Sequence, residues 1–169
     1  MPGTWTACPQ RGLPGQGNAA TLPRLLGLTL PGLLAGTYVR TSPRSGRYNC
    51  IAWAADDQGR NWWCNRRFAY WPDGAPEEHT LAAFEAAFAT RGYERCPDSS
   101  LEAGVEKVAI FADARGPQHA ARQLEDGRWT SKLGKGIDVT HELGTLEGGI
   151  YGSVACYLSR PRVEGRSGG

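Results

Sequence analysis

Residues 105–113 read VEKVAIFAD, and apolar side chains occupy both alternating faces of this segment. A strand with one face in water shows polar residues at every second position, so the pattern predicts a central strand covered on both sides. Such a strand needs paired neighbours and a packed layer on each face. The chain has 169 residues, of which 40% are hydrophobic, and this is enough to form that cover within one domain.

The strongest turn signal follows this strand, in the stretch HAARQLEDGRWTSKLG at 119–134. Asp126 and Gly127 suit a two-residue type I′ turn, which would pair Leu124 with Trp129 and place His119 opposite Gly134. In that register one face of the hairpin is apolar and the other is polar. The apolar face would carry Ala120, Leu124, Trp129 and Leu133, and the polar face His119, Gln123, Thr130 and Lys132.

Two helices are predicted before the sheet. Residues 80–93, TLAAFEAAFATRGY, repeat apolar residues at helical spacing, with Thr80 as the cap and Gly92 at the end. Residues 48–55, YNCIAWAA, predict a short buried helix that Asn49 caps. Further strands are predicted within 136–143 and 151–160. The order of two helices and then a mostly antiparallel sheet predicts an α+β fold.

Composition sets the domain limits and excludes several classes of protein. Residues 1–21 and 161–169 are rich in Gly and polar residues and predict a flexible arm and tail around a single domain at 22–160. A net charge of +2 is too small to indicate nucleic acid or an anionic membrane as the main partner. The apolar run at 25–36 is too short to cross a bilayer, so we expect a cytoplasmic protein.

The cysteines favour neither a disulfide scaffold nor a zinc ribbon. The five are Cys8, Cys50, Cys64, Cys96 and Cys156, an odd number without a CxxC spacing. We therefore expect reduced thiols and no metal cofactor. A site formed by Cys50, His119 and His141 is the one metal alternative, and it lacks an evident supporting carboxylate.

Cys50 is the residue whose chemistry the sequence singles out. Because Asn49 is a favoured N-cap residue, Cys50 would begin the short helix. A thiol attacks carbonyl carbon as the thiolate, and unpaired N–H groups at a helix N-terminus favour that negative charge and can hold an oxyanion. Free cysteine is also often buried as a small apolar residue, so a core thiol is the alternative.

A nucleophilic cysteine needs a histidine as proton carrier, and the chain contains only His79, His119 and His141. His119 begins a predicted strand on its polar face and is our candidate base. Asp138 is the candidate that orients the imidazole, with His141 and Gln123 as alternatives.

The order of these residues resembles that of the papain-like enzymes, including the NlpC, CHAP and transglutaminase-like branches. The piece HAARQLEDGRW is similar to the transglutaminase-like pattern of a strand-starting His, a DGRW hairpin tip and an Asp shortly after. Over about residues 25–160 the chain also resembles a family of small bacterial proteins described as a domain of unknown function. The motifs that carry this second resemblance are YNCIAWA, WWC, YWP, GYERC, EKVAIFA, HAARQL, GRWTSKLG and YGSV.

The papain-like resemblance implies a Cys-bearing N-terminal helix packed on a mostly antiparallel sheet. It also implies a cysteine hydrolase or acyltransferase that acts on an amide, isopeptide or ester bond of a peptide or acyl substrate. Cys50 would attack the carbonyl carbon, His119 would carry the proton, and Asp138 would orient His119. No cofactor is implied.

Two features depart from that pattern. Asp138 lies nine residues beyond Trp129, whereas the transglutaminase-like Asp follows the hairpin Trp by only a few, so the third member stays open. No glutamine stands a few positions before Cys50 to serve as the papain-type oxyanion residue. The oxyanion hole would then use backbone N–H groups or Asn49.

Loops rich in tryptophan supply the expected substrate contacts. The residues assigned to substrate binding are Asn49, Trp62, Trp63, Trp71, Gln123 and Lys132. The tryptophans would form an aromatic wall, while the SKLGKG loop could close over the His119 face. The rival hypothesis is a non-catalytic module on the same fold, whose Trp-rich surface binds a protein or small ligand. The same loops could also simply pack beside the core, with arginines stacked over indoles.

Overall fold

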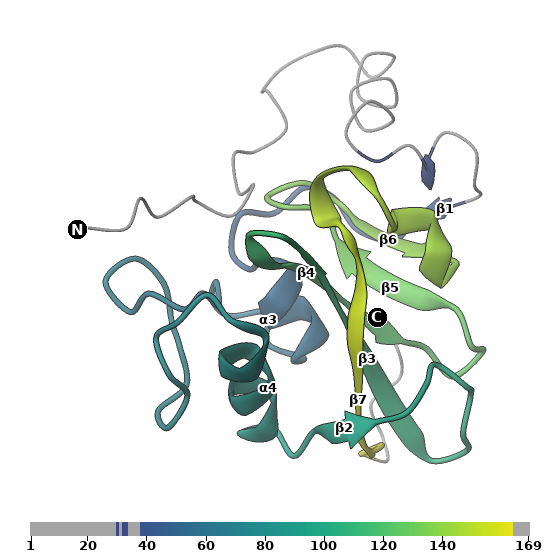
Figure 1. The fold of residues 1–169 in the computed structure, drawn as a ribbon. Helices are drawn as coiled ribbons and strands as arrows, with labels where there is room; N and C mark the ends of the chain where they lie inside the picture. The colour runs from purple at the N-terminus through teal and green to yellow at the C-terminus, as the bar shows by residue number, and fades with distance from the viewer. Residues whose placement is uncertain (1–29, 31, 34–37, 164–169) are drawn as a thin grey trace.

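One antiparallel sheet organises the computed structural model, which describes residues 30, 32–33 and 38–163 (Figure 1). Its seven strands run in the order β1-β6-β5-β4-β3-β7-β2, and every neighbouring pair is antiparallel. The strands are β1 (Tyr38–Arg40), β2 (Glu94–Cys96), β3 (Val105–Asp113), β4 (Gly116–Gln123), β5 (Trp129–Lys132), β6 (Asp138–His141) and β7 (Ser153–Pro161).

The predicted central strand is confirmed. β3 pairs with β4 on one edge and with β7 on the other, and its residues 106–111 are buried. Because both faces of β3 are covered, alternate residues enter two separate cores. Val108 and Ile110 belong to one core, and Ala109 and Phe111 belong to the other.

The two predicted helices and their caps are also present. α3 (Cys50–Ala54) begins where the Asn49 side chain accepts the N–H of Ala52, and α4 (Leu81–Ala89) begins where Thr80 accepts the N–H of Ala83. α3 ends after five residues, and the chain reverses through Asp56 at a φ of 60°. Two 3-10 turns, η1 (Leu143–Leu146) and η2 (Gly149–Tyr151), precede β7.

The predicted papain-like α+β fold is wrong. Within the described residues, α4 is the only helix longer than five residues, and the remaining architecture is the seven-stranded antiparallel sheet with short turns. The physical reason lies in α3, which is too short to form a helical layer. Ten of the buried core residues come from the strands and five from the long 55–80 loop, against nine from α3 and α4 together.

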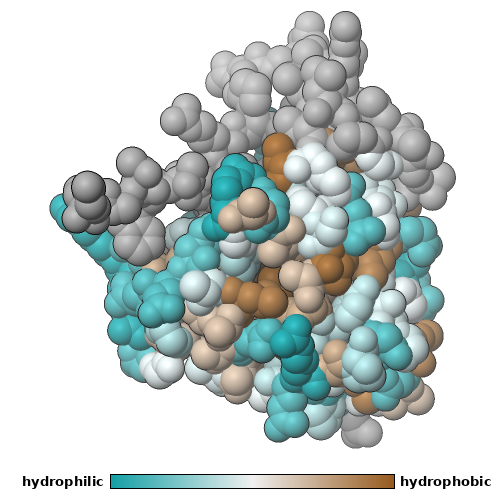
Figure 2. All heavy atoms as spheres, viewed as in Figure 1, coloured by the Kyte–Doolittle hydropathy of each residue, from teal (hydrophilic) through white to brown (hydrophobic). Residues whose placement is uncertain are grey.

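The two cores lie on opposite faces of the sheet. α3, α4 and the tryptophan loop cover one face, which we call the α3 face, while η1, η2 and residues Leu30 and Leu33 cover the other, which we call the η face. Figure 1 shows α3 and α4 on the same side of the strands. On the face seen in Figure 2, apolar side chains gather where β7 runs in Figure 1.

The register of the β4–β5 hairpin differs from the predicted one by one residue. Gln123 pairs with Trp129 and Arg122 with Thr130, whereas the two-residue turn would pair Leu124 with Trp129. The loop holds three residues, Glu125 to Gly127, because Gly127 adopts a φ of 87° and its N–H donates to the Leu124 carbonyl. A slip of one residue moves every β5 side chain to the other face relative to β4.

The domain limits are only partly visible. The predicted arm at 1–21 lies outside the described residues, and of the predicted tail only 161–163 are described, with Pro161 inside β7. None of the helices in the described part of the chain is long and apolar enough to span a bilayer.

Replacement of Gly152 by Ala tests the close approach of the η2–β7 junction to β3. An added Cβ would lie 2.1 Å from the Ala112 carbonyl oxygen, and the backbone φ is 75°. We expect the free energy of unfolding, measured by urea denaturation, to fall by at least about 2 kcal/mol. Gly144→Ala is the matched control because no atom lies within 4 Å of its added Cβ, and equal losses in the two variants would contradict this packing.

Candidate active site

Cys50 is the first residue of α3 and only 4% exposed. The backbone N–H groups of Ala120 in β4, of Ile51 and of Cys50 itself act on the thiol and favour its thiolate form. Burial raises the pKa of the Cys50 thiol to about 11, although these N–H groups and the positive charge of Lys132 act in the opposite direction. The thiol is therefore protonated at neutral pH.

The thiol reaches β4 where the β4–β5 ladder has opened. β4 and β5 share only the pairs Arg122–Thr130 and Gln123–Trp129, so residues 118–121 of β4 have no partner on β5. α3 packs against both strands at this opening. His119 precedes Ala120 in β4, so its side chain points to the opposite face of the sheet from the thiol.

A buried ion pair lies on the α3 face beside Cys50. The Lys132 ammonium donates to the Gly136 carbonyl and lies 3.5 Å from Asp138 Oδ1 and 4.9 Å from the centre of the Tyr48 ring. Tyr48 donates its hydroxyl to Asp138 Oδ2 at 2.6 Å. Burial lowers the pKa of Lys132, and the Asp138 carboxylate opposes that shift. The Asp138 carboxylate thus binds Tyr48 and Lys132.

His119 is fully buried on the η face. It shares that face with Ala121, two residues along β4, and its ring stacks on Tyr151 at 4.0 Å between centroids and lies edge-on to Phe111. No hydrogen bond joins His119 to Cys50 or to Asp138 in the described part of the chain. The structure therefore places Cys50 and Asp138 on the α3 face and His119 on the η face, and it does not join the three predicted catalytic residues.

Ser131 of β5 links His119 to His141. Its Oγ lies 3.0 Å from His119 Nε2 and 2.8 Å from His141 Nε2, while His141 Nδ1 lies 2.7 Å from the Glu142 carbonyl oxygen. A carbonyl only accepts, so a neutral His141 carries its proton on Nδ1 and accepts the Ser131 hydroxyl at Nε2. Ser131 must then accept the Nε2–H of His119.

This chain of hydrogen bonds leaves His119 Nδ1 without a proton, so that nitrogen presents its lone pair. Nδ1 is buried and has no hydrogen-bond partner among the residues described. Burial and the nearby His141 hold the pKa of His119 well below its usual range, and burial lowers the pKa of His141 to about 4. Both imidazoles are neutral at pH 7, as the assigned tautomers require.

Sequence reasoning missed Ser131, although it named His141 as an alternative third residue. In the predicted register Thr130 and Lys132 would share a face with His119. The observed register puts Trp129, Ser131 and Leu133 on that face instead. Gly127 is the residue that could have indicated the observed register, because a glycine at that position permits a three-residue loop as well as a two-residue turn.

The predicted substrate-binding residues are packed into the domain. Trp62 and Trp71 are at most 2% exposed, and Trp63 and Trp71 both contact Phe84 of α4. Asn49 caps α3 and donates to the Trp62 carbonyl, and Gln123 donates to the Ser99 carbonyl. The tryptophans thus support the core, with Arg91 over the Trp62 ring.

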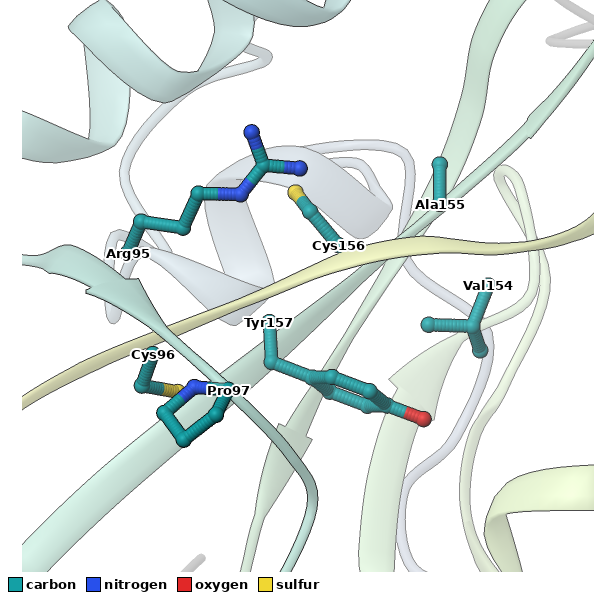
Figure 3. A pocket seen from close by; sticks show the side chains of 7 residues that line it. All are labelled: Arg95, Cys96, Pro97, Val154, Ala155, Cys156 and Tyr157. Carbon is teal, nitrogen blue, oxygen red and sulfur yellow. The ribbon is translucent and has the colours of Figure 1, made fainter.

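The hollow in Figure 3 lies elsewhere, at the edge between β2 and β7. It has a volume of about 520 Å³ and is lined by Arg95, Cys96, Pro97, Val154, Ala155, Cys156 and Tyr157. Figure 3 shows the Arg95 guanidinium beside the Cys156 thiol, with the Tyr157 ring on the other side of β7. Burial raises the pKa of Cys156 to about 12, and none of the predicted site residues lines this hollow.

Metal-ligating side chains do not cluster in the part of the chain that the structure describes. No group of three or more His, Cys, Asp or Glu side chains is placed there to hold an ion. Cys50, Cys64, Cys96 and Cys156 are all free thiols.

The buried histidine pair predicts a loss of stability in mild acid. The folded-state pKa of each imidazole lies below its unfolded value of 6.5, so the unfolded chain binds protons first as the pH falls. We expect the free energy of unfolding to be level above about pH 6.5 and to fall by up to about 1.4 kcal/mol per pH unit and per histidine toward pH 4. Urea midpoints measured across this range, with His141→Gln as the comparison, check it. An unchanged slope in His141→Gln would contradict a buried neutral His141.

Comparison with known proteins gives a family but no activity. No curated protein and no solved structure matches the chain. The family model described as "Domain of unknown function (DUF7689)" matches residues 39–159, which span β1 to β7 and include Cys50, His119 and Ser131. The expected resemblance to a domain of unknown function is confirmed over that range, and the chain belongs to this family.

Proposed function

We propose that this protein is a cysteine-dependent hydrolase or acyltransferase in which Cys50 is the nucleophile and His119 is the base. The observation that carries the proposal is the buried Nδ1 of His119, which has no hydrogen-bond partner among the described residues and belongs to the residue before Ala120, whose N–H acts on the Cys50 thiol from the other face of β4. A histidine that served packing alone would leave this nitrogen without compensation for its lost hydration. Acceptance of the Cys50 thiol proton would give His119 Nδ1 a function that explains its missing hydrogen bond.

The tautomer of His119 suits a general base. A general base must present a lone pair, and the Ser131–His141–Glu142 chain holds the only His119 proton on Nε2. Ser131 and His141 therefore take the orienting position that the sequence suggested for Asp138. His141 acts through Ser131, so both are positioning residues.

The reaction starts from a neutral pair. As the Cys50 sulfur forms its bond to the carbonyl carbon, the thiol proton moves to His119 Nδ1, and the carbonyl π electrons move to oxygen. Collapse of this intermediate breaks the bond to the leaving amine or alcohol, which takes the proton from Nδ1. Water or an acceptor amine or alcohol then releases the acyl group by the same steps in reverse. No cofactor takes part in these steps.

Alkylation of Cys50 by iodoacetamide at neutral pH, read at each cysteine by peptide mass spectrometry, tests the pair. Cys64 is the internal control because its thiol is equally buried and its pKa is also raised to about 11. We expect Cys50 to react at least about 10-fold faster than Cys64, because base assistance contributes roughly 10²- to 10⁴-fold in enzymes.

Two variants separate base assistance from unfolding. His119→Gln keeps an N–H donor toward Ser131 but has no imidazole, so Cys50 labelling should fall to the Cys64 rate while the melting temperature changes little. Ser131→Ala should lower the Cys50 rate by a smaller factor. Cys50 labelling that is slow in the native protein and unchanged in His119→Gln would contradict the enzyme and favour the non-catalytic binding module.

A further inference from the structure

Two basic segments lie beside the Cys50 site. Residues 40–48 and 132–138 together contain five basic residues, and Asp138 is their only acidic residue. The basic residues are Arg40, Arg44, Arg47, Lys132 and Lys135. Since the whole chain has 19 basic and 17 acidic residues, this local excess is not a property of the composition.

The two segments run side by side. The Thr41 N–H donates to the Asp138 carbonyl, the Ser45 N–H donates to the Gly136 carbonyl, and the Asp138 N–H donates to Ser42 Oγ. Arg40 pairs with Val139 in the β1–β6 ladder. These contacts hold the backbones of the two segments together, and we call the pair of segments with its five basic residues the basic rim.

The charge of the basic rim is not neutralised locally. Lys132 is paired with Asp138, whereas Arg40, Arg44, Arg47 and Lys135 are exposed and form no ion pair with any described residue. By contrast, other exposed arginines such as Arg60, Arg115 and Arg128 each have an acidic partner. Four unpaired cations on one rim favour an anionic ligand.

The basic rim connects directly to the thiol. Arg47 precedes Tyr48, and Cys50 begins α3 two residues after Tyr48. The Tyr48 hydroxyl donates to Asp138, and the Tyr48 ring packs against the Lys132 ammonium. The Lys132 charge acts on Cys50, and Arg44 acts on Lys132. A ligand bound on the rim would therefore lie at the N-terminal approach to α3.

We propose that the basic rim binds an acidic peptide segment and so selects carboxylate-bearing peptide substrates for the Cys50 site. This inference rests on the proposed function for its chemical consequence, but the binding itself does not require a reactive thiol. Exposed guanidinium groups donate paired N–H bonds to carboxylates, and the four cations would accept several Asp or Glu side chains in sequence.

Binding is measured on the full chain carrying Cys50→Ser, by fluorescence anisotropy with a labelled short peptide of Glu and Gly. The comparison ligand is the same peptide with Gln for Glu. We expect the Glu peptide to bind at least about 10-fold more tightly at low salt and to lose that preference at high salt. The double variant Arg44→Ser with Arg47→Ser should weaken Glu-peptide binding roughly 3- to 10-fold, because exposed charges contribute modestly.

Arg67→Ser is the matched control because Arg67 is also exposed and unpaired but lies on the 61–70 loop outside the rim. The affinity of the Arg67→Ser variant for the Glu peptide should equal that of the Cys50→Ser chain. Equal affinity for the Glu and Gln peptides, or an equal loss in Arg67→Ser, overturns the proposal. Tighter binding of a single-stranded RNA of matched charge also overturns it, in favour of a nucleic-acid ligand.

The two proposals fail separately. Glu-peptide binding with slow Cys50 alkylation would remove the enzyme and leave an acidic-peptide binding module. Fast, His119-dependent alkylation without a preference for the Glu peptide would keep the enzyme and remove the substrate class.

Discussion

The short β4–β5 ladder is the constraint on which the site depends. After the pairs Arg122–Thr130 and Gln123–Trp129 the two strands separate, and β4 keeps a backbone N–H at Ala120 without a strand partner. The Cys50 thiol reaches that N–H from the α3 face, while Ser131 bridges the gap on the η face. A longer ladder would pair Ala120 with Lys132 of β5 and remove the contact of the Ala120 N–H with the thiol.

The hairpin shows how far a sequence pattern determines a site. The turn was found at the correct residues, and β3, α3, α4 and both helix caps could be predicted because capping residues and apolar spacing act locally. Register is not local in that sense, since Asp126 and Gly127 fit both a two-residue turn and the observed three-residue loop with Gly127 at a φ of 87°. That single residue decides which β5 side chains meet His119.

The candidate site could be predicted only in part, for the same reason. Cys50 was identifiable because it begins α3 after a capping Asn49, whereas His119 was chosen from a predicted polar face and is instead the buried fourth residue of β4. Ser131 could not be found, because its contact with His119 exists only in the observed register. Asp138 was assigned to His119 on chemical type alone, whereas Tyr48, 90 residues earlier in the chain, is what binds its carboxylate. The fold class was wrong although the short helix was predicted, because α3 and α4 cover only part of one face of a seven-stranded antiparallel sheet, and that strand order is not visible in local patterns.

Burial has opposite consequences for the histidine pair on the η face and the Lys132–Asp138 pair on the α3 face. It keeps His119 and His141 neutral, so that the hydrogen-bond chain has one direction and Nδ1 remains a lone pair. It also lowers the pKa of Lys132, but the Asp138 carboxylate 3.5 Å away preserves the positive charge. The cation that favours the thiolate therefore lies on the α3 face with the thiol, while the neutral imidazole lies on the η face, one residue away along β4. The raised pKa of Cys50 shows that, in the resting protein, burial outweighs the backbone N–H groups and the Lys132 charge. Any increase in reactivity must come from proton transfer during attack, which is why the imidazole variant, and not the acidity of the thiol alone, separates a nucleophile from a core cysteine.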